Sequence, residues 1–300
     1  MEKPNILHMF TPTPNVSPFD VNMAYDAGFN AVVPYGNVTL DQIVALTQDA
    51  IFSRGPKGAK RTGIFIGGRE IGLAADMLDA AKRAMVPPFE VSVFADPSGA
   101  FTTAAAMVAC VEKQLKKIHQ TDLSGKNVVV LGGTGPVGAA AAVLASQAGA
   151  RVRIASHTSA TRARMTSEVV NARYGATTEP GDASVVDTKL KMINDADIIL
   201  GAAKAGIQVL SANELATAKR LLVAADVNAV PPVGVEGVGM MDDGAPLAAG
   251  SGKAAAIGAL AIGNVKYQVQ RGLLEAMIAT DKPLYIDFRD AFAAARKLTA

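Results

Sequence analysis

Cysteine is nearly absent from this sequence of 300 residues, and histidine is scarce. The one cysteine, Cys110, has no partner within the chain, which excludes a disulfide framework and a cysteine-based metal site. The three histidines, His8, His119 and His157, show no ligand spacing, so no metal centre is expected. This cysteine usage fits a reducing compartment.

An excess of one charge and a long apolar run are also missing. The 29 basic and 27 acidic residues are interspersed, with a net charge of +2, so no basic stripe can follow a nucleic acid backbone. The N-terminus lacks a sustained apolar region, and the longest low-polarity stretch, Ala254 to Gly263, is far shorter than the roughly 20 residues that cross a bilayer. We expect a cytoplasmic protein that binds neither nucleic acid nor a membrane.

A glycine pattern follows a short apolar run at the centre of the chain. Val128 to Leu131 is typical of a buried parallel strand, and G-x-G-x-x-G follows at Gly133, Gly135 and Gly138. The first glycine permits a tight turn, the second lets backbone approach a pyrophosphate, and the third lets the helix pack on the strand. The helix N-terminus favours phosphate. The pattern predicts dinucleotide binding rather than a simple tight turn, with contacts from Gly133, Thr134, Gly135, Pro136, Val137 and Gly138.

The next strand, residues 151–155, ends without the acid that would bond the ribose 2′-hydroxyl of NAD. Ser156, His157 and Thr158 stand there instead, with Arg162 one turn on. Such groups can donate to a 2′-phosphate, so NADP is favoured, although NAD use stays open. The alternative for Arg162 is that it is only a solvated charge on an exposed helix.

Two later strand ends add cofactor candidates. These are Ala202, Ala203 and Lys204 in a small-residue turn, and Asp226 and Asn228 after the following strand. For Asp226 the alternative is a buried turn carboxylate.

Strands and helices alternate along the whole chain. Further strands are expected at residues 5–10, 31–34, 62–67, 90–95, 177–179, 196–201 and 221–227. Helices are expected at 69–85, 102–119, 160–174, 184–194, 211–218, 264–279 and 287–298. This alternation predicts an α/β protein: an N-terminal α/β domain over 1–120, a Rossmann-type doubly wound parallel sheet over 121–260, and a cleft between them. The C-terminal helices, 261–300, are expected to pack back toward the N-terminal domain.

Polar loops follow the expected strands at 5–10 and 90–95, at the strand ends where α/β sheets place ligands. Asp20, at a helix start, is therefore a candidate site residue or a helix N-cap. No tyrosine has a lysine four positions later, so the Tyr-x-x-x-Lys arrangement of short-chain dehydrogenases is absent. The missing proton-transfer pair indicates a reaction in which only hydride moves.

Several segments resemble the methylene-tetrahydromethanopterin dehydrogenases of methylotrophic bacteria, which resemble methylene-tetrahydrofolate dehydrogenases in fold. They are FDVNMAYDAG, PYGNVTLDQIV, IFSRGPKGAKRTGIFIGG, FTTAAA, LGGTGPVG, DVNAVPPVG and IGALAIGNVK. The resemblance implies oxidation of a tetrahydromethanopterin-type one-carbon carrier to its methenyl form with NADP or NAD, in formaldehyde oxidation. It also suggests a homo-oligomer.

On that reading the product is an amidinium-like cation, which a carboxylate can stabilise. Asp20 is the candidate stabiliser, and Lys266 positions the pterin, with a snorkelling helix lysine as the alternative. The pterin side of the cleft would be lined by Tyr35, Asn37, Thr102 and Thr103. Two other functions stay open: a methylene-tetrahydrofolate dehydrogenase, and a regulator that senses NADP without turnover.

Overall fold

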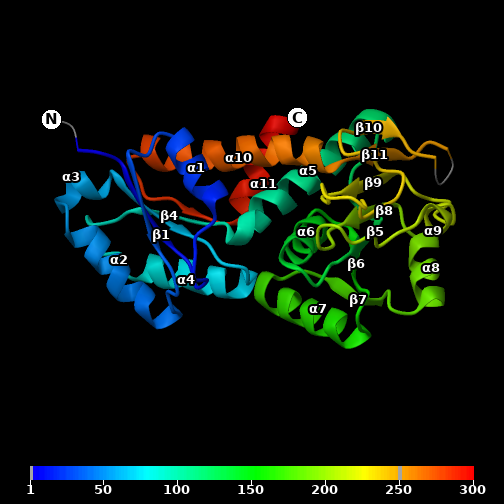
Figure 1. The fold of residues 1–300 in the computed structure, drawn as a ribbon, viewed down its shortest axis with the longest axis horizontal. Helices are drawn as coiled ribbons and strands as arrows, with labels where there is room; N and C mark the ends of the chain where they lie inside the picture. Colours follow the sequence, from blue (N-terminus) through cyan, green and yellow to red (C-terminus); the bar gives the residue numbers. More distant parts are fainter. Residues whose placement is uncertain (1–2, 249–251) are drawn as a thin grey trace. The chain divides into compact units, whose positions relative to one another are not determined.

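The computed structural model describes residues 3–248 and 252–300 (Figure 1). The chain forms two compact units. The first comprises Met1–Thr102 with Tyr267–Ala294, and the second Thr103–Lys266 with Ala295–Ala300. Residues 249–251, part of the glycine- and alanine-rich stretch before α10, lie outside the described residues.

The first unit is built on a parallel sheet of five strands in the order β12-β4-β3-β1-β2. Its strands are β1 (Ile6–Phe10), β2 (Ala31–Tyr35), β3 (Thr62–Ile66), β4 (Ser92–Ala95) and β12 (Tyr285–Ile286). Its helices are α1 (Pro18–Asp26), α2 (Ile43–Phe52), α3 (Gly55–Ala59) and α4 (Ile71–Arg83), with the 3₁₀ turns η1 (Leu40–Gln42) and η2 (Pro97–Gly99). All four strands of this unit expected from the sequence are confirmed, whereas β12 was not expected.

The second unit contains a sheet of seven strands in the order β10-β11-β9-β8-β5-β6-β7. These are β5 (Asn127–Leu131), β6 (Arg151–Ser156), β7 (Thr178–Asp182), β8 (Ile198–Gly201), β9 (Val223–Asp226), β10 (Asp243–Pro246) and β11 (Ala255–Ile257). Its helices are α6 (Pro136–Gln147), α7 (Ala160–Tyr174), α8 (Val186–Asn194) and α9 (Ala212–Leu215). Every pair is parallel except β10 with β11.

This strand order runs outward in both directions from β5, as in a doubly wound dinucleotide-binding sheet. The apolar run of β5 is buried, as expected for a central parallel strand. Helices α6 and α7 pack against β6 and β7 (Figure 1). The predicted α/β class with a doubly wound parallel sheet is confirmed.

Three long or terminal helices complete the fold: α5 (Ala100–His119), α10 (Ala259–Ala279) and α11 (Phe288–Thr299). α10 begins five residues before the expected position of 264, directly after β11. Its first turn is closely packed, because a Cβ at Gly258 would lie 1.9 Å from the carbonyl oxygen of Gly239. Only a glycine fits at position 258, directly before the first residue of α10.

Candidate functional site

The turn after β5 depends on a glycine that the motif did not single out. Gly132 has a φ of +75°, and a Cβ there would lie 2.6 Å from the backbone nitrogen of Ala203. The tight turn that the sequence assigned to Gly133 is therefore made by Gly132. Because Gly132 and Gly133 are adjacent, the sequence alone could not show which of them makes the turn.

Gly133 and Gly138 are needed for close packing. A Cβ at Gly133 would lie 2.8 Å from the carbonyl oxygen of Val130, and one at Gly138 would lie 2.6 Å from that of Gly132. The helix α6 consequently packs directly on the strand-to-helix turn, as expected for the third glycine of the motif.

Gly135, at the start of α6, has room for a Cβ in ordinary contact. It is the N-cap, Pro136 occupies the first turn, and the nearest atom to an added Cβ would be the carbonyl oxygen of Gly132 at 3.4 Å. The backbone N–H groups of Val137 and Gly138 lie in this first helical turn, where the helix dipole favours an anion. The turn thus has the space and polarity that a pyrophosphate requires.

A second loop meets this turn at the middle of the sheet. The chain leaves β5 toward β6 and leaves β8 in the opposite direction toward β9, so the two adjacent strands form a topological switch point. Ala202 and Ala203 lie beside Gly132, and Lys204 is exposed. Ligands of open α/β sheets bind at such a point.

The end of β6 is built differently from what its sequence suggested. Ser156 is buried, and its hydroxyl oxygen accepts hydrogen bonds from the backbone N–H groups of Thr158 and Ser159, both at 3.3 Å. His157, Thr158 and Arg162 are exposed at this edge of the sheet. The Ser156 hydroxyl therefore shapes the turn, and the three exposed side chains remain as candidates for the 2′-position.

Asp226 and Asn228 hold two loops together. The Asp226 carboxylate accepts backbone N–H groups of Asn228 (3.1 Å), Gly234 (2.7 Å) and Val235 (3.0 Å), and its burial raises the pKa of the carboxyl group. The Asn228 side chain accepts the N–H of Gly206 at 3.1 Å. These contacts match the alternative of a buried turn carboxylate.

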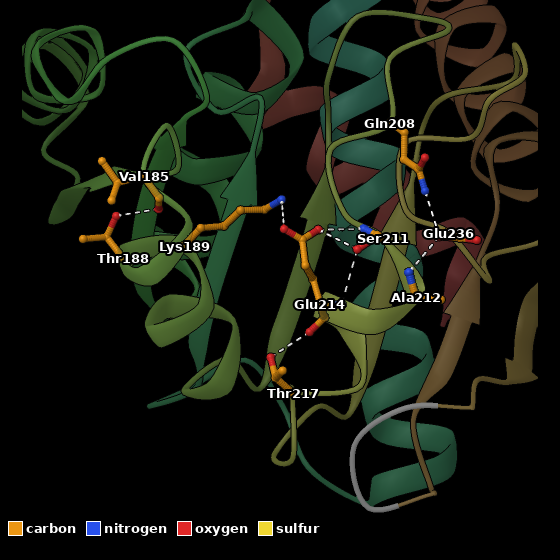
Figure 2. A network of polar contacts seen from close by, with 9 residues as sticks. All are labelled: Val185, Thr188, Lys189, Gln208, Ser211, Ala212, Glu214, Thr217 and Glu236. Atoms are coloured by element: carbon orange, nitrogen blue, oxygen red, sulfur yellow. Dashed lines mark hydrogen bonds and ion pairs between the residues drawn. The ribbon is translucent and has the colours of Figure 1, made fainter.

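A polar network anchors the chain that follows Ala202–Lys204 (Figure 2). Lys189 donates to Glu214 at 2.7 Å, and Glu214 forms a reciprocal capping box with Ser211 at the start of α9. Glu236 accepts from the side-chain amide of Gln208 at 3.0 Å and from the N–H of Ala212 at 2.8 Å. The network fixes the loop beside the switch point to α8 and α9.

In the first unit, two loops meet at the carboxyl edge of the sheet. A Cβ at Gly36 would lie 2.2 Å from the carbonyl oxygen of Pro14, so the loops after β1 and β2 are in close contact. The Tyr35 hydroxyl lies 3.1 Å from Nδ1 of His8, and burial lowers the pKa of that imidazole. Asn37 is exposed, with a φ of +55°.

Asp20 lies buried in the first turn of α1. The N-cap is Ser17, so the interpretation of Asp20 as the cap is wrong. Gln270 of α10 donates to Oδ1 of Asp20 at 2.7 Å. Lys266 is one turn before Gln270 on the same helix face and is buried, unlike a snorkelling lysine.

Thr102 is fully buried and has a structural partner. Its hydroxyl donates to Oδ2 of Asp96 at 2.6 Å, and the N–H groups of Phe101 and Thr102 bond to Oδ1. Asp96 thereby caps α5, a role that the sequence analysis missed. Thr103, the next residue, is half-buried.

Within residues 3–248 and 252–300, no three His, Cys, Asp or Glu side chains gather as a metal-binding group. Nor does any helix in these two ranges combine the length and apolarity needed to cross a bilayer.

Comparison with known proteins gives consistent matches. The family model for the N-terminal part of methylene-tetrahydromethanopterin dehydrogenase matches residues 18–98. The NAD(P)-dependent methylenetetrahydromethanopterin dehydrogenase of Methylorubrum extorquens is 48% identical over 96% of both chains. The bifunctional protein MdtA of the same organism is 30% identical over 98% of both chains. The crystal structure of shikimate 5-dehydrogenase from Listeria monocytogenes, with shikimate and NAD, shares the fold at a TM-score of 0.54 and 15% identity, over 94% of this chain and 93% of that chain.

Proposed function

Because this chain belongs to the methylenetetrahydromethanopterin dehydrogenase family, we propose that it oxidises methylene-tetrahydromethanopterin to the methenyl form with NAD(P)⁺. The observation that carries the proposal is the 48% identity over nearly the whole chain to a relative named for this activity. The glycine turn after β5 supports the nucleotide half of the reaction independently.

The reaction needs little from the protein beyond alignment of the two ligands and a suitable electrostatic environment. The methylene carbon lies between two nitrogens whose lone pairs expel a hydride, and the product is an amidinium-like cation. When bound, the nicotinamide ring accepts this hydride. The side chains therefore have to align the ligands, exclude water and stabilise positive charge.

We assign the nucleotide to the second unit. The first turn of α6 holds the pyrophosphate, with Gly135 providing the open approach. Ala202, Ala203 and Lys204 lie along the cofactor at the switch point, and Asp226 and Asn228 keep the adjoining loops in place. The adenosine part of the nucleotide is assigned to the end of β6, near His157, Thr158 and Arg162.

We assign the pterin to the carboxyl edge of the first unit's sheet. Asp20 is the group that stabilises the developing cation, and Gln270 holds its carboxylate. Tyr35 and Asn37 contact the pterin at this edge, and Lys266 and Thr103 are the further residues that we propose for its recognition. Thr102 acts through its bond to Asp96 by fixing the start of α5.

An assay of purified protein with methylene-tetrahydromethanopterin and methylene-tetrahydrofolate, each with NADP and NAD, tests the proposal. We expect reduced nicotinamide and methenyl-pterin to form together with the methanopterin substrate. Turnover with the folate alone would replace the proposal by the folate dehydrogenase alternative. Nucleotide binding without turnover of either pterin would favour the remaining alternative, a regulator that senses NADP. We also propose that the protein is a cytoplasmic homo-oligomer. Size-exclusion chromatography with light scattering tests the oligomeric state.

A further inference from the structure

The last residue of β7, Asp182, places a carboxylate beside the end of β6, the strand end to which the proposed function assigns the adenosine ribose. Ser156 and Asp182 are register partners on adjacent parallel strands, whose spacing is about 4.8 Å. The carbonyl oxygen of Ser156 accepts the N–H of Ala183 at 2.9 Å, which continues this pairing past the end of β7. The acid absent from the end of β6 is therefore present one strand away.

The carboxylate of Asp182 is fixed and ionised. The backbone N–H of Ser184 donates to Oδ1 at 2.9 Å, and the Ser184 hydroxyl donates to the same oxygen. These hydrogen bonds lower the pKa of the Asp182 carboxyl group. Thr188 donates to the carbonyl oxygen of Asp182 at 2.7 Å, which ties the turn to α8. A negative charge consequently stands at this sheet edge at neutral pH.

A positive charge follows the same strand end a few residues along the chain. Arg162 is exposed in the first turn of α7, close to the end of β6. The Ser156 hydroxyl accepts two backbone N–H groups of its own turn. An adenosine whose ribose lies at the end of β6 would therefore have the Asp182 carboxylate of β7 and the Arg162 side chain of α7 nearby.

We propose that Asp182 is a specificity-determining residue that disfavours the 2′-phosphate of NADP and favours the 2′-hydroxyl of NAD. A 2′-phosphate brings negative charge toward the carboxylate, whereas a hydroxyl can donate to it. Arg162 acts in the opposite sense, so the pair lets the protein accept both nucleotides. The inference rests on the proposed function only in requiring a dinucleotide at the second unit.

Calorimetric binding of two adenosine fragments tests this without turnover. Adenosine 2′,5′-bisphosphate and adenosine 5′-monophosphate differ only at the 2′-position. In Asp182→Asn and Asp182→Ser, we expect the bisphosphate to bind about two- to five-fold more tightly relative to the monophosphate than in the unchanged protein. The gain should shrink at high ionic strength. Asp187→Asn, which removes the same charge from the exposed first turn of α8, is the control and should leave the ratio unchanged.

Two results would overturn the inference. The first is an unchanged binding ratio in both Asp182 variants, with the fold confirmed by circular dichroism. The second is an equal change in the Asp187 control, which would indicate net charge rather than position. Failure of both fragments to bind the unchanged protein would overturn the nucleotide site itself, and with it the proposed function.

Discussion

The side-chain amide of Gln270 donates a hydrogen bond to Oδ1 of Asp20 at 2.7 Å, and both side chains are buried. The bond joins the first turn of α1 to α10 across 250 positions of sequence. A buried carboxylate held in one orientation can stabilise a cation without having to reorganise as charge develops. This hydrogen bond holds the Asp20 carboxylate in one orientation, as the proposed stabilising role requires.

Replacing Asp20 with Ala should lower kcat roughly 100-fold, because it removes the charge that we propose stabilises the amidinium product. The dissociation constant for NADP should stay the same, since the nucleotide is assigned to the second unit. Steady-state kinetics and nucleotide titration measure the two quantities. An unchanged kcat would limit Asp20 to a structural role.

The matched variant is Gln270→Met, which keeps the length of the side chain but removes the donor. We expect a smaller loss of kcat than in Asp20→Ala, together with a loss of about 1–3 kcal/mol in the free energy of unfolding. A larger kcat loss than in Asp20→Ala would mean that Gln270 acts on the substrate itself.

Substitutions at two glycines of the turn after β5 should have different effects, one on nucleotide binding and the other on stability. Gly135→Val fills the open approach to α6, so NADP binding should be lost while the melting temperature is kept. Gly138→Ala places a methyl group 2.6 Å from a backbone oxygen, which should cost about 1–3 kcal/mol of unfolding free energy. Unaltered NADP affinity in Gly135→Val would show that the pyrophosphate binds elsewhere.

The sequence predicted the alternating fold well, because each buried parallel strand leaves a continuous apolar run. It failed where that signal is weak. β10 contains the sequence DGAP, and β12 has only two residues, so neither shows a strand pattern. α9 extends over Ala212–Leu215 rather than 211–218.

The site was less predictable because its polar contacts join distant segments. Motif spacing located the glycine turn after β5 but could not distinguish the role of Gly132 from that of Gly133. The partner of Asp20 lies 250 positions along the chain, and no local pattern encodes that contact. The Thr102 hydroxyl bonds to Asp96 only six residues earlier, but the turn between them is set by the fold and not by a motif that the sequence analysis used.

Glu214 should contribute stability that depends on pH. Burial acts to raise the pKa of its carboxyl group, but hydrogen bonds from Lys189 and Ser211 outweigh this and lower it from 4.5. The unfolded chain then binds the proton more readily, so the contribution is present above about pH 4.5 and is lost as the pH falls through the folded-state pKa.

Glu214→Gln should therefore lose about 1 kcal/mol of unfolding free energy at neutral pH and much less in acid. Urea unfolding at two pH values measures this, with Lys189→Met as the matched variant. An equal loss at both pH values would contradict the assigned role of the ion pair.

The single thiol should be unreactive in the folded protein. Cys110 is buried in α5, and burial raises its pKa to about 12, so almost no thiolate exists at neutral pH. A thiol reagent should label the chain only after denaturant is added. Rapid labelling of the native protein would contradict the packing of α5.

Transfer of deuterium from a doubly deuterated methylene carbon tests the central claim most directly. If only hydride moves, mass spectrometry should find one deuterium in each reduced nicotinamide and none taken from D₂O in a parallel run with unlabelled substrate. Loss of the label to solvent, or solvent deuterium on the nicotinamide carbon, would contradict a reaction that needs no acid or base from the protein.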